Sequence, residues 1–151
     1  MSQSADAQAT PPAAPSPSQI ALANPVIRSG ARWFWWIAGL SLVNIVLFQT
    51  GSNTSFVVGL GITALSDAMF AHNKAVGFVI DALVVGFFVL MGAQAARGML
   101  WAFYVGLTVY ALDALIYLNY QDWMPVAFHA LAIFFIAKGA MALRAALQPT
   151  A

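Results

Sequence analysis

Hydrophobic residues in this chain gather into four long stretches in which polar side chains are few and isolated. The stretches cover residues 32–50, 75–96, 99–118 and 123–143. A helix needs about 20 mostly apolar residues to cross the hydrocarbon core of a bilayer, and helices in soluble cores seldom reach that length without a polar face. The pattern therefore predicts an all-α fold: an integral membrane four-helix bundle.

A fifth apolar segment, residues 55–71, lies between the first two spans. It has only about 17 residues, which is short for a span, and it contains Asp67, Gly59 and Gly61. If it crossed the membrane, the basic residues would be divided equally between the two sides. We therefore expect a short interfacial or re-entrant helix between spans one and two. A fifth span is the open alternative.

The basic residues predict the orientation of the four spans. Five of the six fall on one side of the membrane, namely Arg28, Arg32, Arg97, Lys138 and Arg144. Only Lys74 falls on the other side. Lys and Arg are enriched in cytoplasmic loops, so we expect both termini in the cytoplasm and a bacterial-type inner (plasma) membrane.

The two ends of the chain differ in composition from its centre. Residues 1–24 are rich in Pro, Ala and Ser, with one charged residue and no aromatic residue. Such a segment buries too little apolar surface to offset the entropy of ordering it. We expect a disordered tail at 1–24, a transmembrane domain at 25–147 and a short tail at 148–151.

Composition narrows the classes of function. The chain is 62% hydrophobic and 7% charged, whereas a soluble domain usually has about 25% charged residues. A net charge of +1 argues against nucleic acid as a partner. Cysteine is absent, which excludes disulfides and thiolate chemistry. No nucleotide-binding or hydrolase motif occurs, so no cofactor is expected.

The most polar interior residue of each span lies in its outer half, and we interpret these four residues as one layer. They are Asn44, Asp81, Asp113 and His129. Each lies five or six residues from the outer end of its span, which corresponds to a depth of about 8–10 Å. Tyr110 and Tyr117 share the helix face of Asp113 and are placed to donate hydrogen bonds to it. The sequence predicts that all six side chains form a buried polar cluster.

Three functions are consistent with such a cluster. A structural or interaction subunit would use it to hold the helices together, with the lipid bilayer and a second copy or a larger membrane complex as partners. A proton- or cation-coupled transporter would use Asp81, Asp113 and His129 as a titratable site. A metal-dependent intramembrane enzyme would need ligands, for which Asp67, His72 and His129 are weak candidates. Because ligands are so few, we favour the first function and expect no enzyme activity.

Overall fold

The computed structural model describes residues 14–50 and 59–148, and these form six helices and no strand. The helices are α1 (Pro17–Ala23), α2 (Pro25–Gln49), α3 (Gly61–Met69), α4 (Lys74–Ala96), α5 (Leu100–Asn119) and α6 (Trp123–Ala146). Four of them, α2, α4, α5 and α6, are long and apolar enough to cross a membrane. The all-helical prediction is thus confirmed, and the four apolar helices suggest a multi-pass membrane protein.

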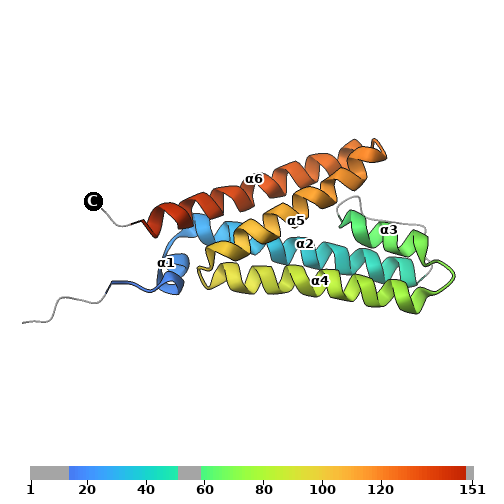
Figure 1. Ribbon diagram of the computed structural model, residues 1–151, viewed down its shortest axis with the longest axis horizontal. Coiled ribbons are helices and arrows are strands. Elements are labelled where there is room, and N and C mark those ends of the chain that lie inside the picture. The colour runs from blue at the N-terminus through green and yellow to red at the C-terminus, as the bar shows by residue number, and fades with distance from the viewer. Residues whose placement is uncertain (1–13, 51–58, 149–151) are drawn as a thin grey trace, which may run out of the picture.

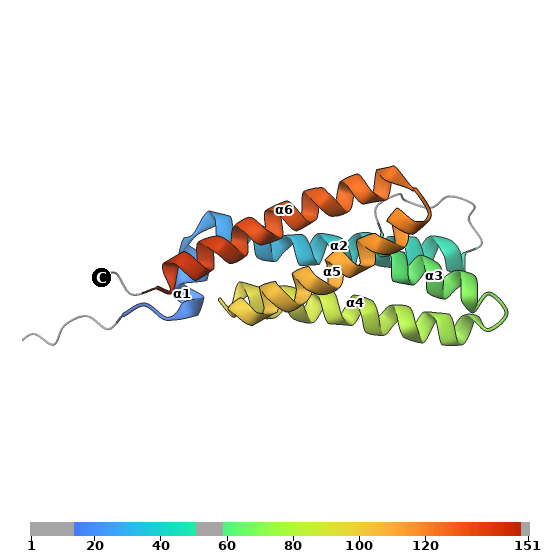
Figure 2. The same cartoon turned by 45° about the horizontal axis from the view of Figure 1, so that its top comes forward.

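The four long helices run lengthwise beside one another, with the two short helices at opposite ends (Figures 1 and 2). Helix α2 packs against α4 and α6, and α5 packs against α6 and α4. Helix α1 lies at the end that holds the α4–α5 turn, where Gly98 has a φ of +78°. Helix α3 lies at the other end and contacts α4, α5 and α2.

Small residues let α2 and α6 approach closely near the α1 end of the bundle. A Cβ added at Gly30 would lie 2.8 Å from the Gly139 Cα, a distance that leaves no room for a side chain at either position. The adjacent core is aromatic: the Phe34 ring lies 6.4 Å from Phe88 and 6.1 Å from Phe103, centroid to centroid. Close backbone approach at small residues is typical of helix pairs in membranes.

The prediction of a disordered tail at 1–24 is wrong for the residues that form α1. The Ser16 hydroxyl accepts the Gln19 N–H at 3.3 Å, and the Gln19 side chain accepts the Ser16 N–H at 2.7 Å. This reciprocal capping box starts a helix that buries Ala21 against the bundle. Composition misses such a helix because a few residues decide it. Residues 1–13 of the predicted tail lie outside the described residues.

The first span begins earlier than predicted, at Pro25 rather than at residue 32. The Asn24 side chain caps it by accepting the Val26 N–H at 2.9 Å. Proline at the first helical position needs no hydrogen-bond partner there. Arg28 and Arg32 therefore lie within the helix rather than before it.

The predicted segment 55–71 forms one short helix, α3, of nine residues. Its length is about 13 Å, less than half the thickness of the hydrocarbon core. The alternative of a fifth span is therefore wrong for the part that the structure describes. Residues 55–58 lie outside it, as do residues 149–151 of the short C-terminal tail.

Candidate functional site

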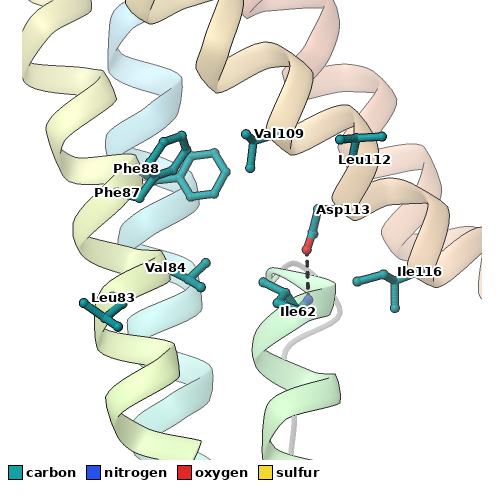
Figure 3. Close-up of a pocket in the computed structure, with 9 residues that line it drawn as sticks. All are labelled: Ile62, Leu83, Val84, Phe87, Phe88, Val109, Leu112, Asp113 and Ile116. Carbon is teal, nitrogen blue, oxygen red and sulfur yellow. Dashed lines mark hydrogen bonds between the residues drawn. The ribbon is translucent and has the colours of Figure 1, made fainter.

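Asp113 of α5 is the centre of the buried polar contacts. Its carboxylate accepts the N–H of Gly61 at 2.7 Å and the N–H of Ile62 at 2.8 Å, the latter drawn in Figure 3. The third contact is His129 of α6, whose Nε2 lies 2.9 Å from Asp113 Oδ2. These bonds join the first turn of α3 to α5 and α6. A carboxylate at a helix N-terminus satisfies free N–H groups and lies at the positive end of the helix dipole.

His129 is fully buried, and both of its ring nitrogens have partners. Its Nδ1 lies 2.8 Å from the carbonyl oxygen of Pro125. A carbonyl oxygen can only accept, so Nδ1 carries a proton and donates it. A hydrogen bond between Nε2 and Asp113 Oδ2 needs a second proton on one of these two atoms. With that proton the pair has no net charge, which lowers the cost of burying it.

The two tyrosines contact the histidine rather than the aspartate. The Tyr110 ring stacks on the His129 ring with centroids 4.3 Å apart and planes 13° apart. Tyr117 lies 5.3 Å from the same ring and donates its hydroxyl hydrogen bond to the Gly59 carbonyl at 3.3 Å. The predicted bonds from these tyrosines to Asp113 are not formed among the described residues. Backbone N–H groups of α3 donate to the Asp113 carboxylate in place of the tyrosine hydroxyls.

Helix α2 holds the residues just before α3. The Ser41 hydroxyl accepts the Leu60 N–H at 3.1 Å. The Asn44 side chain lies directly against Gly59, where an added Cβ would collide with the Asn44 Nδ2. At Gly61 an added Cβ would lie 3.1 Å from two side chains of α5. Both glycines therefore let the chain fit closely between α2 and α5.

Asp81 of α4 does not join Asp113 and His129. It is fully buried, and neither of its carboxylate oxygens has a hydrogen-bond partner within the described residues. Its polar neighbours come from α3: it interacts with Ser66 and Asp67. The Ser66 hydroxyl itself donates to the Gly77 carbonyl at 3.3 Å. The predicted layer is thus divided between two places, one at each end of α3.

The three candidate metal ligands are not brought together. His72 is exposed in the α3–α4 turn, and the ring nitrogens of His129 are both engaged. Burial raises the pKa of Asp67, and the nearby Lys74 opposes this effect. Across residues 14–50 and 59–148, no group of three or more His, Asp or similar side chains is placed to hold a metal ion.

Ser41 and Ser66, which bind the chain at the two ends of α3, are not among the predicted cluster residues. Ser41 lies one helical turn before Asn44, so it shares the face of that residue. This spacing was the available signal for Ser41. No sequence pattern indicated the contact of Ser66, because its acceptor is the backbone carbonyl of Gly77 rather than a side chain.

A cavity of about 490 Å³ lies between α4 and α5, beside the start of α3 (Figure 3). Its lining is apolar except for Asp113 and consists of Ile62, Leu83, Val84, Phe87, Phe88, Val109, Leu112, Asp113 and Ile116. Leu83 and Leu112 are more than half exposed, so the cavity opens to the surroundings of the bundle. It offers no polar group that the α3 contacts do not already use. These contacts are the basis for inferring a function, since no family model, no curated protein and no solved structure matches the chain.

Proposed function

We propose that this protein is a structural or interaction subunit of a membrane, without chemistry of its own, in which the polar cluster fixes α3 between the spans. The observation that carries the proposal is the saturation of Asp113. Its carboxylate is engaged by two N–H groups of α3 and by His129. A residue occupied in this way supports the structure and has no free group to offer a substrate.

A re-entrant helix requires hydrogen-bond acceptors for the N–H groups of its first turn, and the polar residues provide them. Asp113 lies six residues before the end of α5, about 9 Å along the helix. If α5 spans a bilayer, α3 begins within the hydrocarbon region, where no water is present to satisfy its first N–H groups. Asp113 and Ser41 accept hydrogen bonds from three of these groups, those of Leu60, Gly61 and Ile62. Interhelical hydrogen bonds of this kind stabilise one arrangement of spans.

The distribution of basic residues supports an orientation with both termini in the cytoplasm of a bacterial-type cell. Three tryptophans at the same end, Trp35, Trp36 and Trp101, are 46%, 60% and 48% exposed, as expected of rings at a membrane–water interface. Reporter fusions after Ala151 and inserted at His72 test this orientation. The first should report the cytoplasm and the second the opposite side. An external C-terminus would overturn the orientation.

The outer surface of the bundle supports a partner role. Beyond the lipid bilayer, a second copy or another subunit of a larger membrane complex can pack where small residues leave space. A Cβ at Gly39 of α2 or at Gly86 of α4 would meet no atom within 4 Å. Such positions allow a second helix to approach closely.

Native mass spectrometry after extraction in a mild detergent tests the partner role. We expect an oligomer or a complex that Gly39→Leu or Gly86→Leu weakens, because the added side chain occupies the open space. Leu115→Phe, on an exposed part of α5, is the control and should leave the complex intact. A wild-type protein that is monomeric under these conditions would overturn the proposal.

Proton or cation handling is the second candidate, and one observation favours it: Asp81 is buried without a hydrogen-bond partner in the described part of the chain. A single site formed by Asp81, Asp113 and His129 is not supported, because Asp81 faces α3 instead. A stable Asp81→Asn variant separates the two candidates. A structural subunit keeps its complex and its cellular role, whereas a transporter that uses Asp81 loses its role.

A further inference from the structure

Asp81 lies on the face of α4 that α3 covers. Gly77, one turn before it, is in close contact with α3: an added Cβ would lie 3.5 Å from the Phe70 Cβ and 3.8 Å from the Ser66 Oγ. The Ser66 hydroxyl donates to the Gly77 carbonyl at 3.3 Å and also interacts with the Asp81 side chain. The Asp81 carboxyl group is therefore enclosed between two helices and receives no hydrogen bond from the described residues.

An ionised carboxylate in this position would be buried without a counter-charge, which is far less favourable than a neutral acid. A protonated carboxyl group is different, because it is itself a donor and needs only an acceptor. Asp67 of α3, which is half-buried, provides that acceptor, since its side chain interacts with Asp81. Two carboxyl groups at close range share one proton more readily than they both ionise.

The other charged groups around α4 do not provide a counter-charge. Lys74 acts on Asp67 rather than on Asp81. Helix α2 carries ionisable residues only near its opposite end, at Arg28 and Arg32, and α1 carries none. From α5, Asp113 is bound to the start of α3. Asp67 is the one charged side chain of the described residues that acts on Asp81.

We propose that Asp81 and Asp67 form a proton-binding site between α3 and α4, in which Asp81 holds the proton and shares it with the Asp67 carboxylate. The half-buried Asp67 connects this proton to the aqueous side next to the α3–α4 turn. Loss of the proton would place two negative charges across the α3–α4 contact and loosen α3. The site is separate from the Asp113–His129 pair and holds whether or not the protein is a structural subunit.

Infrared spectroscopy of the full-length protein in lipid nanodiscs tests the proposal. The wild type should show the carbonyl stretching band of a protonated carboxylic acid at neutral pH, and Asp81→Asn should remove the part of the band that Asp81 contributes. Asp122→Asn is the matched control, because Asp122 is exposed, and it should leave the band unchanged. Either the absence of the band in the wild type or an unchanged band in Asp81→Asn would overturn the proposal.

Two further measurements keep the test decisive if Asp81→Asn does not fold. Asp67→Asn should change the pH at which the band disappears by about one unit or more, because coupled carboxyl groups titrate as a pair. An unchanged pH would mean that Asp67 does not share the proton. Sodium chloride, compared with choline chloride at the same ionic strength and pH, should not bleach the band. Bleaching by sodium would show that the site takes a metal cation in place of the proton.

Discussion

The contact between Asp113 and His129 predicts that replacing both residues is less harmful than the two single replacements suggest. Asp113→Leu removes the acceptor of three groups: the N–H of Gly61, the N–H of Ile62 and the Nε2 of His129. His129→Leu removes one of the three donors to Asp113 and the ring that stacks on Tyr110. In the double variant neither member of the pair is left alone.

The expected losses in the free energy of unfolding follow from the number of buried groups that lose a hydrogen-bond partner. Each buried group without a partner costs about 1–3 kcal/mol, and Ile62 is only part-buried. We therefore expect Asp113→Leu to lower the free energy of unfolding by about 3–6 kcal/mol. His129→Leu should lower it by about 2–4 kcal/mol, which includes the lost ring stacking. The double variant should lose about 1–3 kcal/mol less than the sum of the two.

Unfolding titrations of the four proteins in mixed detergent micelles measure this coupling. The control cycle pairs Asp81→Leu with His129→Leu, which share no partner, so these losses should add to within about 0.5 kcal/mol. Hydrogen exchange gives a second test, because the amides of Gly61 and Ile62 should exchange faster in Asp113→Leu than in His129→Leu. Additive losses in the Asp113 cycle, or equally strong coupling in the Asp81 cycle, would refute the assignment of contacts.

Three further predictions address other parts of the molecule. Gly30→Ala should lower the free energy of unfolding by about 1–3 kcal/mol, because its methyl group would lie 2.8 Å from the α6 backbone; Gly39→Ala, which has open space, should be neutral or slightly stabilising in the same titration. Deleting residues 2–24 should lower the melting temperature, because it removes α1 and the buried Ala21; an unchanged melting temperature would show that α1 does not stabilise the bundle. Burial raises the pKa of Asp67 above its ordinary value of 3.8. The folded protein therefore binds this proton more tightly than the unfolded chain does. The stability that results from this difference is lost as the pH rises through the folded pKa. Asp67→Asn should therefore reduce the decline of the melting temperature above pH 3.8, and an unchanged pH profile would contradict this.

The four long helices could be predicted because the length of an apolar stretch is a property of each segment alone. The very short connections between the long helices explain why α5 packs against both α4 and α6. The start of α2 and the whole of α1 depend instead on single capping residues. The Asn24–Pro25 pair and the Ser16–Gln19 capping box were both readable signals. The prediction instead followed the continuous apolar stretch, which starts only after Arg28 and Arg32, and it therefore placed the start of the span too late.

The position of each polar residue along its helix could be predicted from the sequence. The neighbouring helix that each polar side chain faces could not. Depth follows from the rise per residue, and it correctly placed Asp113 beside His129. Which neighbour a side chain meets depends on how the helices are rotated and on where the connecting segment runs. The path of residues 59–69 between α4 and α5 is set by tertiary packing. For this reason Asp81 interacts with Asp67 on α3 rather than with His129.

The gathering of Ser41, Asp113 and His129 around the start of α3 has a physical explanation. A helix that starts among the spans presents several unpaired N–H groups at one level, and each neighbouring span can satisfy only those that it faces. Ser41 of α2 accepts the N–H of Leu60, and Asp113 of α5 accepts the N–H of Gly61. His129 of α6 contacts the Asp113 carboxylate. Asp81 of α4 faces a later part of α3, where no backbone N–H group of the described residues donates to its carboxyl group. Asp113 holds the start of α3 through its hydrogen bonds, and Asp81 has no such role. The protonation of Asp81 can therefore change while the start of α3 stays bound to Asp113.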